Sequence, residues 1–172
     1  MNLEKYRNQI TDLIRGRSRQ PFMLNGSEEH AAIIVERMFA NANTEMRILS
    51  RRFNPTIYAD DDVLAQVENF ASNPDTKTSI IIEDISDESL SVHRLANLAD
   101  ALPNVEVRRL PVDVSEQVNF NYSVMDKRGY RFEDNKAKVN AIVRFDDPSF
   151  TEAAADYFDD LWEISNPIAI PA

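Results

Sequence analysis

The stretch Ser79-Ile80-Ile81-Ile82-Glu83 is a short continuous apolar run, with three isoleucines between two polar residues. It predicts a strand that is buried on both faces, because neighbouring side chains of a strand point in opposite directions. Strands of this kind are typical of parallel sheets that carry helices on both sides. The stretch therefore indicates an α/β domain, and the flanking segments have the pattern that such a domain needs.

On either side of this stretch, helical and strand patterns alternate. Ser27 is a good N-cap for a helix over residues 28–42, and Asp61 or Asp62 caps a second helix that Asn73-Pro74 ends. A third helix opens at Asp87 and ends at Pro103-Asn104. Strands are predicted at Met46–Ser50, Ser79–Glu83 and Val105–Leu110. The order helix, strand, helix, strand, helix, strand predicts parallel strands joined by crossover helices.

The second half of the chain changes character. Phe120, Tyr122 and Val124 alternate with polar residues, which predicts a strand with period two. Turns are predicted at 126–129 and 133–136, and further strands at 130–132 and 139–145. A final helix starts at Asp147-Pro148 and carries a strong apolar stripe that ends at Leu161 and Trp162. We therefore expect a mixed sheet, with a parallel βαβ part, an antiparallel meander and helices on both faces.

The first 20 residues form a separate segment by pattern. Leu3, Tyr6, Ile10 and Leu13 recur at helical spacing, so a short amphipathic helix is predicted. Residues 15–21 then form a basic linker that contains three arginines. We predict that residues 1–20 are an appendage, with the helix as a docking arm, and that residues 21–172 form the α/β domain.

Composition excludes several classes of function. The chain has no cysteine, so disulfides, thiolate metal sites and a cysteine nucleophile are excluded. Its net charge of −10 repels phosphate backbones and anionic lipid, which argues against non-specific nucleic-acid binding. Charges interrupt residues 1–14, and no apolar run approaches the length that spans a bilayer. We expect a cytoplasmic protein without membrane attachment.

The order of elements and several local strings resemble a single repeat of the phospholipase D superfamily. The resemblance covers residues 28 to 165. It depends on the strand Met46–Ser50, on Val105-Glu106-Val107-Arg108 after a helix that ends in Leu102, and on the strand that ends at Asp126. The closing string 157–162 is similar to the Phe-x-x-x-Trp helix that follows the family's active motif. Within the superfamily, the chain is most similar to a group of bacterial proteins with degenerate motifs, some of them fused or adjacent to acyltransferase domains.

The resemblance also indicates which chemistry is missing. Active members carry His-x-Lys, four further residues and Asp; the His attacks phosphorus and the Lys neutralises phosphate charge. With Asp126 at the family's Asp position, Asn119 replaces the His and Asn121 replaces the Lys. The Gly-Ser-x-Asn segment expected downstream is absent. Asn offers neither a nucleophile nor a positive charge, so phosphodiesterase activity by the family's mechanism is not expected.

A vestigial cleft is predicted around these positions. Asn119 and Asn121 are two residues apart, so on a strand both amides would project from one face and could bind a ligand. Arg51, Arg52 and Arg108 follow or end parallel strands, and could join them in an anion pocket at the carboxyl edge of the sheet. The simpler alternatives are a decayed surface for the asparagines and ordinary ion pairs for the arginines.

The two histidines and the acidic strings indicate no metal or cofactor. His30 lies in the first turn of a predicted helix, and His93 is expected mid-helix, where it could point toward the carboxyl edge. The two are not in metal-ligand spacing. Asp60-Asp61-Asp62, Asp146-Asp147 and Asp159-Asp160 lack the pattern of a calcium loop and are explained by helix capping. Three glycines cannot build a phosphate-binding loop.

Three functional hypotheses follow. The first is a non-catalytic binding or interaction domain, a pseudoenzyme that uses the cleft near Asn119 and Asn121; the resemblance implies a homodimer, and an acyltransferase-type protein as partner. The second is a nuclease or phosphatidyl-transferring enzyme in which His93 is a displaced nucleophile. The third is a nucleic-acid-binding module, which the acidic composition disfavours.

Overall fold

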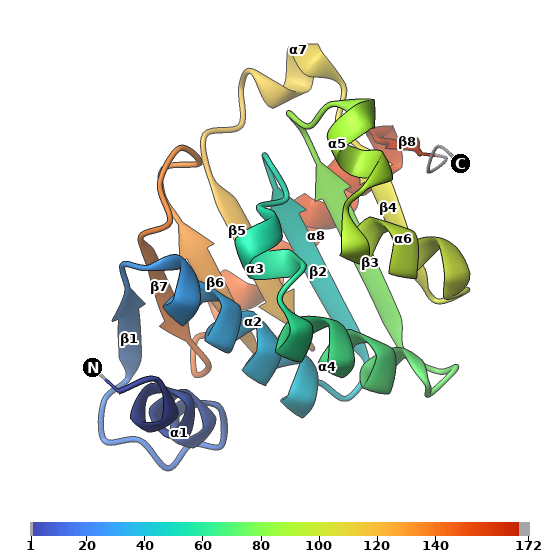
Figure 1. The fold of residues 1–172 in the computed structure, drawn as a ribbon. Helices are drawn as coiled ribbons and strands as arrows, with labels where there is room; N and C mark the ends of the chain where they lie inside the picture. The colour runs from blue at the N-terminus through green and yellow to red at the C-terminus, as the bar shows by residue number, and fades with distance from the viewer. Residues whose placement is uncertain (1, 169–172) are drawn as a thin grey trace.

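The centre of the molecule is the parallel part of one mixed sheet. The computed structural model describes residues 2–168 and contains an eight-stranded sheet of order β1-β7-β6-β5-β2-β3-β4-β8 (Figure 1). Its parallel strands are β2 (Glu45–Ser50), β3 (Lys77–Ile82) and β4 (Val105–Arg109). The isoleucines of β3 are fully buried, as expected for a strand that is covered on both faces.

Antiparallel strands complete the sheet on both sides. A meander of β5 (Asn121–Met125), β6 (Gly129–Glu133) and β7 (Ala141–Arg144) pairs with β2 through β5. The edges are β1 (Phe22–Asn25), beside β7, and β8 (Asn166–Pro167), beside β4. The predicted mixed sheet is therefore confirmed. The two edge strands were not predicted, because four and two residues are too short for a periodic pattern.

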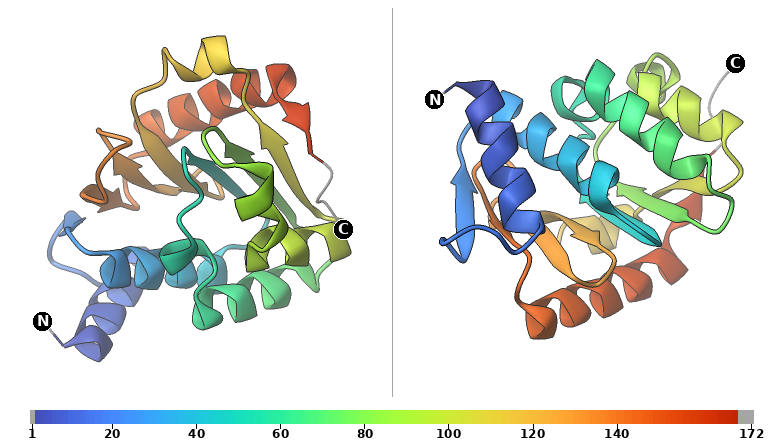
Figure 2. Two further views of the ribbon diagram at one scale, coloured as in Figure 1. Left: turned by 45° about the horizontal axis from the view of Figure 1, so that its top comes forward. Right: turned by 90° about the horizontal axis from the view of Figure 1, so that it is seen from below.

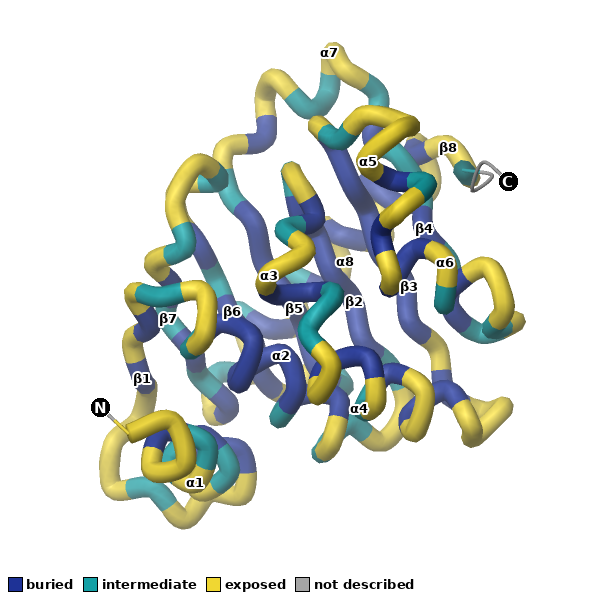
Figure 3. The backbone as a smooth tube through the Cα atoms, viewed as in Figure 1, coloured by how far each residue is buried: buried dark blue, intermediate teal, exposed yellow. Residues whose placement is uncertain are grey.

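Helices cover both faces of the sheet (Figure 2). One face carries α1 (Leu3–Ile14), α2 (Glu28–Asn41), α3 (Pro55–Tyr58), α4 (Asp61–Ala71), α5 (Asp87–Ser91) and α6 (Arg94–Ala101). The other face carries the long helix α8 (Pro148–Ile164), and α7 (Val112–Ser115) lies in the connection between β4 and β5. Each face has its own apolar cluster, and the residues of the central strands between them are mostly buried (Figure 3). No helix within residues 2–168 combines the length and the apolar character needed to cross a bilayer.

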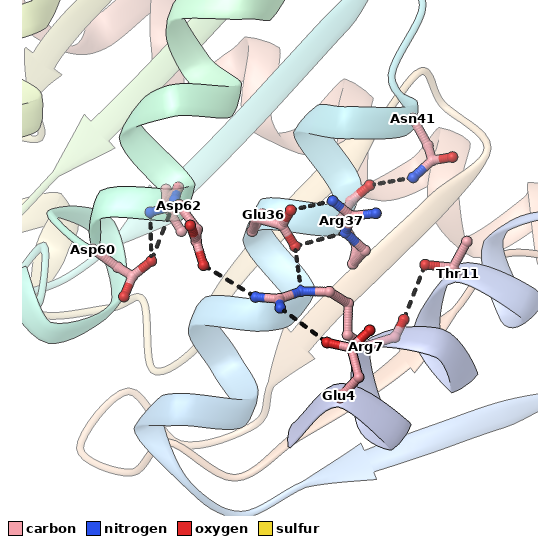
Figure 4. Close-up of polar contacts among 9 residues, drawn as sticks. Glu4, Arg7, Thr11, Glu36, Arg37, Asn41, Asp60 and Asp62 are labelled. Carbon is pink, nitrogen blue, oxygen red and sulfur yellow. Dashed lines mark hydrogen bonds and ion pairs between the residues drawn. The ribbon is translucent and has the colours of Figure 1, made fainter. Parts of the chain in front are cut away.

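The N-terminal helix is part of the core. Tyr6 and Ile10 of α1 are fully buried against α2, in the same apolar cluster as the parallel strands. Figure 4 shows the polar contacts beside this interface: Arg7 contacts the buried Glu36 of α2 at 3.4 Å and Asp62 of α4 at 3.1 Å. The predicted helix is confirmed. Its apolar face is occupied within the chain, so the prediction of a docking arm is wrong.

The predicted helix between Asp87 and Leu102 is two helices. After α5 the chain turns at Val92, and His93 becomes the N-cap of α6 by accepting a hydrogen bond from the backbone N–H of Ala96 at 3.4 Å. Leu90 before the break and Leu95 after it pack into the same apolar cluster, which made one long helix the natural prediction, whereas Val92 at the break is exposed. The mid-helix position predicted for His93 is therefore wrong.

Candidate functional site

A small polar hollow, here called the cleft, lies where β2 ends and β5 begins. Its volume is about 170 Å³. The residues around it come from the start of α2, the end of β2, α3, β5, β6 and the β6–β7 connection: Glu28, Ser50, Arg52, Asn54, Ile57, Tyr58, Asn121, Glu133, Lys136, Ala137, Lys138 and Val139. The cleft thus occupies the carboxyl edge of the parallel strands, where α/β sheets usually bind ligands.

Asn121 lines the cleft and is held firmly. Its Oδ1 accepts a hydrogen bond from the backbone N–H of Arg51 at 2.9 Å, and its Nδ2 donates to Glu133 at 2.7 Å. These contacts connect β5 to the end of β2 and to the end of β6. Asn121 is thus one of the lining residues, but its oxygen and one of its N–H groups are committed to hydrogen bonds within the protein.

Asn119 lies outside the cleft. Strand β5 begins only at Asn121, and Asn119 is an exposed residue of the preceding connection. Its carbonyl oxygen accepts a hydrogen bond from the backbone N–H of Lys136 at 3.0 Å. The strand was expected to begin earlier, so the prediction that both asparagines project from one strand face into the cleft is wrong.

Asp126 has a structural role at the opposite end of β5. Its carboxylate accepts hydrogen bonds from the backbone N–H groups of Asn43, Thr44 and Glu45 at 2.7, 2.8 and 3.0 Å, and from the Thr44 hydroxyl at 3.0 Å. Asp126 also has a positive φ of 52°, a conformation that Asp tolerates better than most residues. It fastens the β5–β6 turn to the start of β2, far from the cleft.

The carboxylate of Glu133 belongs to a buried charge network. Arg131, which is only 1% exposed, forms an ion pair with Glu133 at 2.5 Å. The same guanidinium donates to Asn25 at 3.2 Å and to the Val139 carbonyl at 3.0 Å. Buried charges persist only when they are paired and hydrogen-bonded, as these are. The network therefore holds Glu133 in place beside the cleft and balances its charge.

A second ion pair holds Lys136, another residue that lines the cleft. Lys136 contacts the fully buried carboxylate of Glu83 at 3.0 Å and donates to the Ser115 carbonyl at 2.8 Å. The Ser115 hydroxyl donates to the same Glu83 oxygen at 2.7 Å. Sequence reasoning missed Glu133, Lys136 and Lys138 because it treated residues 133–136 as a turn. Lys136 and Lys138, two residues apart at the end of this turn, were the one feature of the sequence that could have indicated a basic site here.

The arginines do not converge as predicted. Arg52 lines the cleft and forms no ion pair within residues 2–168. The side chain of Arg51 pairs with Asp84 at 3.4 Å. Arg108 lies elsewhere, with its guanidinium 4.2 Å from the centre of the Trp162 ring, bonded to Glu106 and to the Trp162 carbonyl. The prediction that Arg108 contributes to the cleft is therefore wrong.

His93 is enclosed by protein. Its Nε2 lies 2.8 Å from the Phe53 carbonyl oxygen, its Nδ1 caps α6, and its ring stacks on Phe53 at 4.1 Å. Burial lowers the pKa of His93, which favours the neutral ring. Both ring nitrogens are occupied, so His93 has no free atom with which to attack a phosphate. His30 stacks on Tyr6 at 3.9 Å, in the interface between α1 and α2.

Phe53 connects His93 to the cleft and has a strained backbone. Its φ is +48°, which is a rare value for a bulky side chain, and its side chain is fully buried. The ring packs against Tyr58, a cleft residue, at 5.2 Å. Burial raises the pKa of Tyr58, so its phenol stays protonated at neutral pH. The stack of His93 and Phe53 thus holds the loop that carries Arg52 and Asn54.

The acidic strings have structural contacts instead of a metal-binding arrangement. Asp60 caps α4 and Asp147 caps α8, while Asp159 forms a bidentate contact with Arg47 at 2.9 and 3.1 Å. Across the described part of the chain, no group of three or more histidines, aspartates or glutamates is placed to hold a metal ion.

Comparisons with known proteins identify the fold. Residues 27–169, most of the chain, match a family model described as Domain of unknown function (DUF7931). No curated protein matches.

Three solved structures are similar over most of this chain. Nuc from Salmonella typhimurium, a phospholipase D family member, has a TM-score of 0.60 at 15% identity over 86% of this chain and 97% of that one. NucT from Helicobacter pylori has a TM-score of 0.64 at 16% identity, over 86% of this chain and 98% of that one. TrmBL2 is an archaeal chromatin protein whose structure shows a novel mode of DNA binding. It has a TM-score of 0.64 at 12% identity, over 96% of this chain but only 62% of its own length. At these identities the likeness shows the fold alone, and that fold is phospholipase D-like.

Proposed function

The chain belongs to the family described as Domain of unknown function (DUF7931), and from this premise we propose that it is a non-catalytic binding domain with a phospholipase D-like fold. The proposal makes it a pseudoenzyme: the scaffold is retained, and the cleft binds a ligand without transforming it.

The proposal rests mainly on Asn121, which has no charge and whose side chain is hydrogen-bonded within the protein. An active member of the superfamily needs a histidine and a lysine in its cleft, and no histidine lines the cleft described above. At the position of the lysine, Asn121 is uncharged and bonded to Arg51 and Glu133. Losing a nucleophile costs several orders of magnitude in rate. His93, the only other nucleophile suggested by the sequence, has both ring nitrogens engaged.

The charges of the cleft favour a small polar ligand with one anionic group. Lys136 is balanced by Glu83, and Glu133 is balanced by Arg131. Arg52 and Lys138 remain without ion pairs in residues 2–168. The lining also includes the exposed carboxylate of Glu28, which accepts a hydrogen bond from Asn54. A charge-assisted contact to these two cations would orient such a ligand. The volume of about 170 Å³ is below the usual range for drug-sized ligands, so the cleft suits only a small molecule.

A chromogenic phosphodiester assay tests the absence of catalysis. With bis(p-nitrophenyl) phosphate we expect no turnover above buffer, either for the natural sequence or for Asn121→Ala. The matched control is Asn140→Ala, which removes an exposed amide outside the cleft. Turnover by the natural protein that Asn121→Ala abolishes and Asn140→Ala retains would contradict the proposal.

A titration tests ligand binding in the cleft. The protein is titrated with phenyl phosphate, and the chemical shifts of its backbone amides are measured. We expect the amides of Ser50, Arg52 and Asn121 to shift at lower ligand concentrations than those of other residues. The double substitution Arg52→Gln/Lys138→Gln should remove these shifts, whereas Lys77→Gln, an exposed cation on another edge, should retain them. Shifts that persist in the double variant would count against the cleft as a binding site.

We also propose that the chain forms a homodimer, as the resemblance to single-repeat members implies, and that an acyltransferase-type protein is its partner. Sedimentation equilibrium should give twice the chain mass of 19.7 kDa at micromolar concentration. A single species of 19.7 kDa across that range would refute the dimer.

A further inference from the structure

A second hollow lies at the opposite edge of the sheet, between the N-terminal linker and the β5–β6 turn. Its volume is about 550 Å³. Arg15 and Arg19 of the linker and Arg128 of the turn line it, with Leu13, Ile14 and Phe145 as apolar surface. We call it the arginine hollow. Residues more than 100 positions apart in sequence thus bring three guanidinium groups to one concave surface.

The linker is held in a defined conformation. Helix α1 ends in a Schellman motif, in which Gly16 has a φ of +67° and its N–H donates to the Leu13 carbonyl at 3.2 Å. The N–H of Arg17 donates to the Asp12 carbonyl at 2.8 Å, which completes the motif. On the other side, the hydrogen bonds of Asp126 fix the turn that carries Arg128. Both walls of the arginine hollow are therefore preorganised.

The arginines of this region are uncompensated, which is unusual in this protein. The chain has 29 carboxylate residues and a net charge of −10, and most of its arginines form ion pairs. Within residues 2–168, the arginines without an ion pair are Arg15, Arg17, Arg19, Arg52 and Arg128. Four of these five belong to the linker and the turn. The one carboxylate that lines the arginine hollow, Asp146, is bonded to Arg144 at 2.6 Å.

We propose that the arginine hollow binds a small molecule that carries two or more phosphate groups. Guanidinium groups match phosphate oxygens with paired N–H donors, and three of them neutralise most of the charge of a di- or triphosphate. The volume lies within the usual range for small-ligand sites, and the apolar surface can receive an organic substituent. A long polyanion fits less well, because the net charge of −10 repels it beyond the local contact.

Calorimetric titration with inorganic triphosphate tests this proposal. We expect saturable binding that is weaker for pyrophosphate and weakest for phosphate. The double substitution Arg19→Gln/Arg128→Gln should weaken triphosphate binding by about tenfold or more, because it removes two of the three guanidinium groups that would contact the phosphates. The matched control Lys5→Gln/Arg94→Gln removes the same net charge from exposed residues elsewhere and should leave the affinity unchanged. Thermal unfolding of all variants verifies that each is folded.

Three outcomes would overturn the proposal. The first is no binding of triphosphate by the natural protein at millimolar concentration. The second is equal weakening by the two double variants, which would show a response to net charge alone. The third is a preference for a macromolecule: retention of a single-stranded oligonucleotide or of anionic phospholipid vesicles that depends on Arg19 and Arg128 while triphosphate does not bind.

Discussion

At the scale of single residues, the burial of His93 makes the stability of the protein depend on pH. Its folded-state pKa is lowered from 6.5 by desolvation, so the unfolded chain takes up a proton that the folded chain resists. Stability is therefore expected to fall as pH decreases below about 6.5, toward the lowered pKa of the folded state. We predict that chemical unfolding at pH 7.5 and 5.5 shows a smaller loss of stability for His93→Gln than for the natural protein. An identical loss in both would refute this.

Gly129 illustrates a residue that packing requires. A Cβ atom added there would lie 1.8 Å from Cδ1 of Phe145, whose ring is largely buried. We predict that Gly129→Ala lowers the free energy of unfolding by about 1–3 kcal/mol through overpacking. Gly26→Ala is the control, because its Cβ would meet only the Asn140 amide at 3.7 Å. If the clash with Phe145 causes this effect, the double variant Gly129→Ala/Phe145→Ala will lose less free energy of unfolding than the sum of the losses in the two single variants.

At the scale of elements, α1 behaves as part of the core. The buried Ile10 and the ion pairs of Arg7 with Glu36 and Asp62 attach α1 to α2 and α4 (Figure 4). We predict that Ile10→Ala lowers the free energy of unfolding by about 2–5 kcal/mol, as for other large-to-small core substitutions, with a single cooperative transition. Lys5→Ala on the exposed side of α1 should change it little. A separate early transition in Ile10→Ala would indicate that α1 is instead an independent appendage.

At the scale of the whole molecule, the sheet separates two polar sites. The cleft lies at the carboxyl end of β2, whereas the arginine hollow lies beside the β5–β6 turn at the other end of β5, and the two sites share no lining residue. Distant sites without shared partners act additively. We predict that Arg52→Gln/Lys138→Gln leaves the triphosphate affinity of the arginine hollow unchanged in calorimetry. When these substitutions are combined with Arg19→Gln/Arg128→Gln, we expect the protein to lose phenyl phosphate binding and triphosphate binding to the same extent as in the two separate double variants. Strong coupling would show that the ligands meet at one site.

The sequence by itself determined the elements and their order. Continuous apolar runs, period-two alternation and capping residues report local burial, so they predicted the parallel strands, the meander and α8 within a few residues. Charge and the absence of cysteine likewise excluded several chemistries. Asn121 was singled out by the resemblance to the family motif, and the structure places it among the residues that line the cleft.

Only the tertiary structure decided which side chains meet. The contacts of Asn121 with Glu133 and of Lys136 with Glu83 join segments that no periodicity relates. The arginine hollow likewise brings Arg128 and the linker arginines to one surface. Arg108 and His93 show the converse: residues that sequence reasoning assigned to the cleft are held by Trp162 and Phe53 instead. The physical reason is that a side chain pairs with whatever the fold brings within reach, and burial makes an unpaired polar group costly. The state of each group in a site is therefore a property of the packed molecule.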